Sequence, residues 1–281
     1  MHTLVLVAKK DKAEAAELAV RIRERYPSHE VLGDRLLAHA LGWPRLEDRE
    51  LAARADLLVV LGGDGTLIHG ARLLDGRATP ILGVNLGSLG FMTETPVEEL
   101  FAVLDEVLAG RFKVDSRMKL TCRMVRDGQV VLQDEVLNDV VINKGALARI
   151  ADHEVSIEGV PMATYKADGV ILSTPTGSTA YALSAGGPIV HPSVDCTVLA
   201  PICSHALTHR PIIVPADRTI RVALRTETAD TFLTLDGQTG HGLQCGDSIE
   251  VVRSPNRVHL VRNTRVGYFS ILRQKLHWGE R

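Results

Sequence analysis

A glycine-rich turn with one acid, GGDGT at residues 62–66, has the residue types that hold phosphate. It follows a continuous apolar run at residues 57–61, which is typical of a strand buried on both faces of a parallel sheet. Apolar residues then recur at roughly helical spacing, which predicts a helix from Thr66 onward. We expect the glycines to adopt positive φ and to admit a ligand to the backbone, where a helix start favours an anion.

Asp64 inside this predicted phosphate cradle indicates a metal ion or a proton to be moved. The alternative is structural, because an isolated Asp-Gly pair is more often only a turn. The second glycine and the buried strand before it favour the functional interpretation without deciding it. The P-loop pattern G-x-x-x-x-G-K-[ST] is absent from the sequence, and no G-x-G-x-x-G follows a predicted strand.

Three further polar clusters stand out in the second half of the chain. Asn138-Asp139 lies inside an apolar, strand-like stretch, where paired polar residues are disfavoured except at an edge or a bulge. Residues 168–181 (DGVILSTPTGSTAY) lead from a strand into a turn with more hydroxyl groups than a helix cap needs. Asp236-Gly237-Gln238 ends a strand, where an ordinary hairpin turn is the strong alternative. Sequence chemistry alone therefore favours a phosphoryl transferase with a phosphate cradle and an acid.

Two kinds of secondary-structure pattern position these clusters. Strands at 4–8, 57–61 and 80–85 alternate with helices at 12–25, 47–55 and 96–109, which predicts a parallel sheet covered on both sides. Residues 31–44 are ambiguous. After Phe112, strand-like segments at short spacing predict a β-sandwich-like domain. We expect an α/β domain over 1–113, a β-rich domain over 114–266, and a C-terminal helix within 267–281 that packs back on the first domain.

Composition narrows the class of protein. The chain has 281 residues, of which 45% are hydrophobic and 23% charged, and a formal net charge of −2. No basic run is interleaved with aromatic residues, so we expect no nucleic-acid partner. No stretch reaches transmembrane length, and the N-terminus has the wrong order for a signal peptide. The cysteines form no C-x-x-C pair and are predicted to be buried thiols in a reducing compartment, so we expect a cytoplasmic protein with no membrane partner.

Together the four clusters resemble the NAD kinase family, of the ATP- or polyphosphate-dependent bacterial type. They occur in that family's order and approximate spacing, as do Gly186-Gly187-Pro188 and the C-terminal LRQKLHWG that ends at Gly279. GGDG alone is shared with diacylglycerol, sphingosine and phosphofructo-kinases. GGDG together with TPTGSTAY is highly specific, and the resemblance extends over nearly the whole chain.

The resemblance implies a kinase that transfers the terminal phosphoryl of ATP, or of polyphosphate, to the 2′-hydroxyl of the adenosine ribose of NAD and forms NADP. It implies a Rossmann-like first domain of the phosphofructokinase and diacylglycerol-kinase type, and a second domain that binds the dinucleotide. It also implies a homodimer or homotetramer and Mg²⁺ carried with ATP, without metal-ligating residues of the protein. By the same resemblance Asp64 is the catalytic acid/base; Gly62, Gly63 and Thr66 cradle phosphate; and Gly65, His69, Asn138, Asp139, Arg149, Lys166, Asp168, Thr179, Ala180, Tyr181, Ala182, Leu183, Ser184 and Gln238 bind substrate.

One departure concerns the ribose contact. Most relatives in that family carry Asn-Glu where this chain has Asn138-Asp139, so the side chain that carries the carboxylate is one methylene shorter.

Three alternative functions remain: a lipid or sugar kinase with the same GGDG element, a dinucleotide sensor without turnover, and a serine hydrolase at Ser184. A sensor without turnover would be indicated by the loss of Asp64, and Asp64 is present. A serine hydrolase is disfavoured because the sequence around Ser184 lacks the first glycine of the G-x-S-x-G elbow. The sequence leaves the donor, the use of NADH and inhibition by NADP open.

Overall fold

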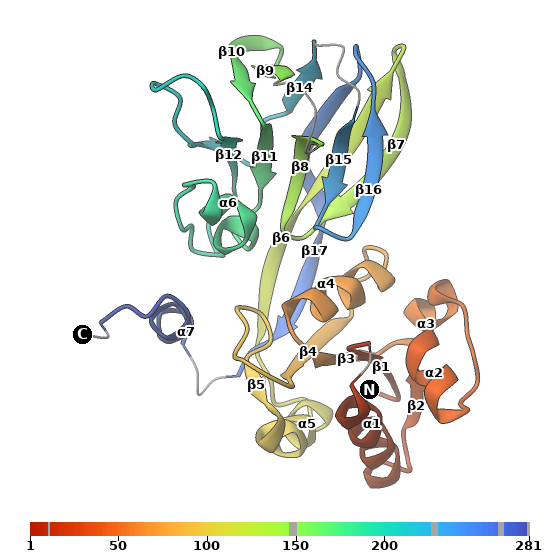
Figure 1. Ribbon diagram of the computed structural model, residues 1–281. Helices are drawn as coiled ribbons and strands as arrows, with labels where there is room; N and C mark the ends of the chain where they lie inside the picture. The colour runs from red at the N-terminus through yellow and green to blue at the C-terminus, as the bar shows by residue number, and fades with distance from the viewer. Residues whose placement is uncertain (11, 146–150, 226–229, 264–266, 280–281) are drawn as a thin grey trace. The chain divides into compact units, whose positions relative to one another are not determined.

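The computed structural model describes residues 1–10, 12–145, 151–225, 230–263 and 267–279 (Figure 1). The chain forms two compact units: unit 1 is Met1–Ser116 with Val258–Arg281, and unit 2 is Arg117–Arg257. Both divisions fall inside strands, β6 (Val114–Arg126) and β17 (Ser248–Val261). Residues from Val258 therefore group with unit 1, whereas the sequence placed them in the β-rich domain. The reason is that His259 and Leu260 pair with a strand of the first unit.

Unit 1 is built on a parallel sheet with the strand order β17–β4–β3–β1–β2. Each pairing along this order is parallel, and β5 adds to β4 in the same direction. The central strands are buried along their length, as the continuous apolar runs predicted. The strands are β1 (Thr3–Ala8), β2 (Glu30–Gly33), β3 (Leu57–Gly62), β4 (Pro80–Asn85) and β5 (Thr95–Pro96).

Helices cover this sheet on both faces. Leu4, Leu6 and their neighbours on one face share a core cluster with residues of α1 and α5. On the other face α4 packs so closely that a Cβ at Gly70 would lie 2.9 Å from Leu58. The ambiguous segment 31–44 contains β2 and a capped helix, in which Asp34 accepts from the Leu37 amide. The helices are α1 (Ala13–Arg25), α2 (Arg35–Leu41), α3 (Asp48–Arg54), α4 (Asp64–Leu73), η1 (Val97–Glu99), α5 (Leu100–Leu108) and α7 (Tyr268–Lys275).

Unit 2 contains an antiparallel sheet in the order β13–β12–β11–β8–β15–β16, while β10, β9, β14 and β17 form a second row and β6 pairs with β17 and β7. Apolar side chains from both groups of strands form one core, as expected for a sandwich. The elements are β7 (Gln129–Val136), β8 (Asp139–Lys144), β9 (Ala151–Ile157), β10 (Val160–Ala167), β11 (Gly169–Ser173), η2 (Gly177–Thr179), α6 (Tyr181–Ser184), β12 (Cys196–Ile202), β13 (Ile212–Pro215), β14 (Ile220–Leu224), β15 (Thr231–Leu235) and β16 (Thr239–Leu243).

Two sequence-based expectations are wrong in this region. The strand-like stretch around Asn138 is two strands, because the chain leaves β7 and enters β8 of the other sheet at Leu137–Asn138. The cysteines are not all buried: Cys122 and Cys196 are, but Cys203 and Cys245 are exposed. In the described part of the chain, no helix is long and apolar enough to span a membrane.

Candidate functional site

The glycine-rich turn joins β3 to α4, which begins at Asp64, two residues earlier than predicted. None of Gly62, Gly63 and Gly65 has positive φ, so the expected left-handed turn is absent. Gly62 is required by packing, since a Cβ there would lie 2.5 Å from Thr66 Oγ1. At Gly63 and Gly65 an added Cβ would meet nothing within 4 Å. Neither a positive φ nor close packing therefore requires glycine at these two positions. The missing side chains leave open space above the turn.

The Asp64 carboxylate holds the loop that follows β4. Its Oδ1 accepts from the amides of Met92 (3.0 Å) and Thr93 (3.1 Å) and from Thr93 Oγ1 (3.1 Å). Its Oδ2 accepts from the Phe91 amide at 2.7 Å. A carboxylate offers about four acceptor positions, two on each oxygen. Within the described residues Oδ1 is therefore saturated, whereas Oδ2 keeps one lone pair for a further donor.

The same loop is fixed from within by Asn85, the last residue of β4. Its Nδ2 donates to the Ser88 carbonyl at 2.6 Å, and its Oδ1 accepts from the Gly87 amide at 2.6 Å. Gly90 has no room for a side chain, because a Cβ there would overlap Asp64 Oδ1 and Thr93 Oγ1. The loop is thus positioned at the carboxyl ends of β3 and β4, which pair at Gly62 and Asn85.

Several predicted residues line one cavity of about 450 Å³ in unit 1, namely Gly63, Gly65, Thr66 and His69. The structure therefore brings most of the predicted phosphate cradle together. The other residues that line this cavity were not predicted from the sequence; they are Ala8, Lys9, Lys10 and Leu36.

In unit 2 the Asn138-Asp139 pair is held by Asp236, which sequence reasoning left as an ordinary turn residue. Asp236 Oδ1 accepts from the amides of Asn138 (2.6 Å) and Asp139 (3.1 Å), and its Oδ2 accepts from Leu137 (2.9 Å). Asp236 and Gly237 both have positive φ, as a tight hairpin turn between β15 and β16 requires. This hairpin thus fixes the backbone of the predicted ribose-binding pair.

The hydroxyl-rich turn after β11 holds the same backbone from the other side. Thr174 Oγ1 donates to the Leu137 carbonyl at 2.6 Å, and the Thr174 amide and Ser173 Oγ both donate to the Asn138 carbonyl. Gly177 leaves no room for a Cβ next to the Asn138 carbonyl. Asn138 Oδ1 is enclosed and has no hydrogen-bond partner among the described residues. It is the kind of buried acceptor that a ligand donor would satisfy.

Asp139 is a buried carboxyl group, 5% exposed, at the start of β8. It is neither at a sheet edge nor at a bulge, because β8 pairs with β11 on one side and β15 on the other. Burial, and secondly the charge of Asp236, raise the pKa of Asp139 to about 7. The protonated form of Asp139 is therefore far more favoured near neutral pH than that of an ordinary carboxyl group.

The remaining predicted residues of unit 2 are separated from this cluster. Asp168 precedes β11 and lies 3.5 Å from Lys144 Nζ, whereas Ser173 ends the same strand beside Asn138. At about 3.3 Å per residue, Asp168 and Ser173 are roughly 17 Å apart along the strand. Lys166 is exposed on β10 and Gln238 on the β15–β16 turn. Arg149 lies outside the described residues.

Residues 179–184 comprise the last residue of η2, the N-cap Ala180 and the short helix α6. Ala182 is fully buried against Val141, Ile171 and Ala200, so it packs α6 onto the sheet. Tyr181 and Ser184 are exposed, while Thr179, Ala180 and Leu183 are half-buried. Ser184 lies in α6 and not at a strand-to-helix turn, so the nucleophile elbow of a serine hydrolase is not formed.

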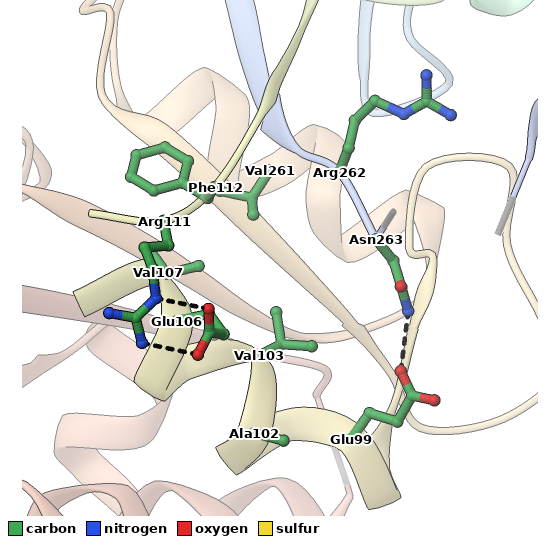
Figure 2. A pocket seen from close by; sticks show the side chains of 10 residues that line it. All are labelled: Glu99, Ala102, Val103, Glu106, Val107, Arg111, Phe112, Val261, Arg262 and Asn263. Carbon is green, nitrogen blue, oxygen red and sulfur yellow. Dashed lines mark hydrogen bonds and ion pairs between the residues drawn. The ribbon is translucent and has the colours of Figure 1, made fainter. Parts of the chain in front are cut away.

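A separate cavity of about 290 Å³ lies between α5 and the end of β17 (Figure 2). Its acids are paired within the protein: Glu106 forms a two-pronged ion pair with Arg111, and Glu99 accepts from Asn263 at 3.0 Å. Its described lining residues include none of the predicted site residues. It is therefore not the candidate site.

Comparison with known proteins identifies the family of the chain. Residues 43–112 match the model of the ATP-NAD kinase N-terminal domain, and residues 137–263 match that of the ATP-NAD kinase C-terminal domain. An NAD kinase of Geobacter sulfurreducens is 53% identical over 246 residues, covering 88% of this chain and 87% of its own. An NAD kinase of Koribacter versatilis is 44% identical over 285 residues, covering both chains fully.

Solved structures show the same fold. A yeast NADH kinase complexed with NADH has a TM-score of 0.93 at 27% identity, covering 100% of this chain and 89% of that one. An NAD kinase from Archaeoglobus fulgidus in complex with ATP has a TM-score of 0.78 at 26% identity and covers 99% of both chains. The glycine-rich cradle with Asp64, the clamped Asn138-Asp139 pair and these matches lead to one conclusion: the chain belongs to the NAD kinase family.

Proposed function

We propose that this protein transfers the terminal phosphoryl of ATP to the 2′-hydroxyl of the adenosine ribose of NAD and forms NADP, with Asp64 as the acid/base. The observation that carries the role of Asp64 is its hydrogen bonding. Four donors fix the carboxylate, yet among the described residues Oδ2 accepts only from the Phe91 amide. A substrate hydroxyl can donate to the remaining lone pair of Oδ2 without displacing the loop.

Positioning contributes more than basicity in this proposal. A ribose hydroxyl is a poor nucleophile, and phosphoryl transfer proceeds with little proton movement until late in the reaction. Asp64 therefore orients the hydroxyl and accepts its proton as the phosphoryl group arrives. Because the loop of residues 91–93 holds the carboxylate in one place, little reorganisation is needed when the substrate binds.

Mg²⁺ is proposed to arrive with ATP. Among the described residues, no group of three His, Cys, Asp or Glu side chains is placed to hold a metal ion. Mg²⁺ commonly binds through substrate phosphates and one or two carboxylates, and we propose that the nucleotide holds most of its ligands here. The ion would neutralise charge on the phosphates, while the turn at residues 62–66 supports them.

The dinucleotide is proposed to bind at Asn138 and Asp139. Asn138 Oδ1 offers an unused acceptor for a ribose hydroxyl, and Asp139 can accept or donate near neutral pH, since its pKa is raised to about 7. Asp168 and Lys166 are then reached by another part of an extended ligand. From the family resemblance we also propose a cytoplasmic homodimer or homotetramer, which light scattering on the purified protein would test.

The test is an NADP-formation assay with NAD, ATP and Mg²⁺ on wild type, Asp64→Asn and Thr93→Val. Thr93→Val is the matched control, because it removes one hydrogen bond to Asp64 but keeps the carboxylate. We expect turnover in the wild type, a loss of at least ~100-fold in Asp64→Asn, and a loss below ~10-fold in Thr93→Val.

The outcomes separate the parts of the proposal. Equal losses in both variants would mean that Asp64 acts by holding the loop and not as the base. Full activity of Asp64→Asn would remove Asp64 from the chemistry and leave the kinase assignment intact. A wild type that binds NAD without forming NADP would support a dinucleotide sensor instead.

A further inference from the structure

The segment that joins β12 to β13 is bonded to the backbone of two predicted dinucleotide contacts, and we define its residues 203–211 as the β12–β13 loop. The His205 amide donates to the Lys166 carbonyl at 2.9 Å. The Asp168 amide donates at 3.0 Å to the carbonyl of Ile202, the last residue of β12. The loop and the end of β12 therefore fix the main chain from which both predicted contacts project.

Lys166 needs such support because it lies on an edge strand. β10 is the last strand of its row, and among the described residues it pairs only with β9. The Lys166 side chain is exposed, and Asp168 is half-buried with its Oδ1 3.5 Å from Lys144 Nζ. An exposed lysine and a weakly paired carboxylate can meet an anionic group and a hydrogen-bond donor of a ligand. Where they do so depends mainly on the position of their backbone.

The loop is closed on itself and onto β10 by His209. Ser204 Oγ and His209 Nδ1 share a hydrogen bond of 2.7 Å. The imidazole of His209 also packs edge-on against the phenol ring of Tyr165, with 4.6 Å between the ring centroids. Tyr165 is 3% exposed and directly precedes Lys166 on β10. One half-buried imidazole thus joins the two ends of the loop and holds the loop against the strand of Lys166.

The backbone of the loop is strained at the point where it leaves β12. Cys203 has a φ of +47°, which a residue with a side chain rarely adopts. Such a conformation persists only where the surrounding structure holds it. The bond between Asp168 and Ile202 holds it on one side, and the bond between Ser204 and His209 holds it on the other. Loss of the second bond should therefore let the chain relax at residue 203 and shift the groups bonded to it.

We propose that His209 is a positioning residue for the acceptor: it fixes the β12–β13 loop, and the loop fixes Lys166 and Asp168 for the dinucleotide. This proposal rests on the proposed kinase function and on the predicted roles of those two residues. His209 itself does not touch the substrate. It acts on the binding of NAD, and neither on the binding of ATP nor on the phosphoryl transfer. Loss of His209 therefore raises KM for NAD and leaves kcat and KM for ATP unchanged.

A double-mutant cycle tests whether His209 acts through the two predicted contacts. His209→Ala removes the hydrogen bond and the ring contact, and Ser204→Ala removes only the hydrogen bond. Both substitutions are made in the full chain, once in the wild type and once in a Lys166→Ala/Asp168→Ala background. Thr208→Ala is the matched control, because Thr208 is exposed in the same loop next to His209.

The NADP assay gives kcat and KM for ATP and, from rates far below saturation, kcat/KM for NAD, while thermal unfolding checks that each variant is folded. In the wild-type background His209→Ala is expected to lower kcat/KM for NAD by ~10-fold and Ser204→Ala by ~3-fold. Both should leave kcat and KM for ATP within ~2-fold. In the Lys166→Ala/Asp168→Ala background each is expected to change kcat/KM for NAD by less than ~2-fold, because the groups to be positioned are gone. Thr208→Ala should match the wild type.

An equal loss in both backgrounds would show that His209 does not act through Lys166 and Asp168, and it would overturn the proposal. An unchanged kcat/KM for NAD in His209→Ala, or a rise in KM for ATP alongside that for NAD, would overturn it as well. If Lys166→Ala/Asp168→Ala itself keeps the wild-type kcat/KM for NAD, the assignment of these two contacts fails and the proposal fails with it. A wild type that forms no NADP would instead refute the kinase function. The same cycle, measured as NAD binding by calorimetry, then still tests His209.

Discussion

Asp236 Oδ1 lies 2.6 Å from the backbone amide of Asn138, across 98 positions of the sequence. The same carboxylate also accepts from the amides on both sides of Asn138. A turn residue of one hairpin therefore fixes the chain where it passes from β7 to β8. Such bonds to a charged acceptor are stronger than neutral ones, so the geometry of the predicted ribose site depends on a residue in the turn of another strand pair.

Replacing Asp236 with Asn should weaken both stability and NAD binding. Only one oxygen remains, and the new amide group faces the Leu137 amide as a second donor. We expect a loss of about 1–3 kcal/mol in the free energy of unfolding and a higher KM for NAD. Urea unfolding and the NADP assay measure the two effects.

The matched control is Asp127→Asn. Asp127-Gly128 is also an Asp-Gly turn with positive φ at both residues, but the Asp127 side chain is exposed. Its replacement should change stability by less than about 0.5 kcal/mol. Equal effects at both turns would show that turn conformation, and not the three bonds of Asp236, is what the substitution disturbs.

Much of unit 1 was predictable, because its central strands carry an unambiguous signal. Residues 57–61 and 80–85 are continuous apolar runs bounded by turn residues, a pattern that parallel strands buried on both faces produce. The break at Leu137–Asn138 was not predictable in this way. Val136 and Val140 are both fully buried in the same core, so the apolar pattern continues across the change of sheet.

The sequence was sufficient to predict the residues of the candidate site, but not the residues that hold them in place. The GGDGT turn is visible in the sequence. Whether a glycine there is needed for a positive φ or leaves space for a ligand depends on the surrounding atoms, which the sequence does not give. Asp236 was assigned to a hairpin turn correctly, but its hydrogen-bond partners are distant in sequence and leave no local signal. Lys9 and Lys10 have no distinguishing pattern, since two lysines after a strand are most often solvated.

Asp139 should make stability fall as pH rises toward neutrality. Its folded pKa, raised to about 7 by burial and by Asp236, lies above the ordinary value of 3.8. The folded state thus binds the proton more tightly, so the stabilisation is complete below about pH 4 and is lost as pH rises through 7. The ionised form is disfavoured by on the order of 4 kcal/mol. Asp139→Asn should remove this dependence and be the more stable protein at pH 8. Urea unfolding at pH 5 to 8 measures the difference, and parallel curves for both proteins would contradict it.

His153 should make stability fall as pH decreases, which is opposite to the effect of Asp139. Its side chain is fully buried, and burial lowers its pKa below the ordinary value of 6.5. The unfolded state then binds the proton more readily, so stability is present above about pH 6.5 and is lost as pH falls toward the folded value. Replacement by Leu should flatten the curve between pH 7 and 5. His191→Leu, at an exposed position, is the control and should keep the wild-type slope. A wild-type slope in His153→Leu would assign the acid sensitivity to other groups.

The loop held by Asp64 should distinguish two glycines that look alike in the sequence. At Gly90 a Cβ would overlap Asp64 Oδ1 and Thr93 Oγ1, whereas at Gly87 it would lie 4.0 Å from Asn85 Oδ1. Neither residue has positive φ, so backbone strain does not enter the comparison. Gly90→Ala must push the carboxylate away from the amides of residues 91–93, which should lower the free energy of unfolding by about 1–3 kcal/mol. Gly87→Ala should stay within about 0.5 kcal/mol of the wild type. Thermal and urea unfolding of the two variants measure this contrast. Equal stability would mean that the loop can shift without losing its bonds to Asp64, and the fixed position of that carboxylate would then no longer support its proposed role.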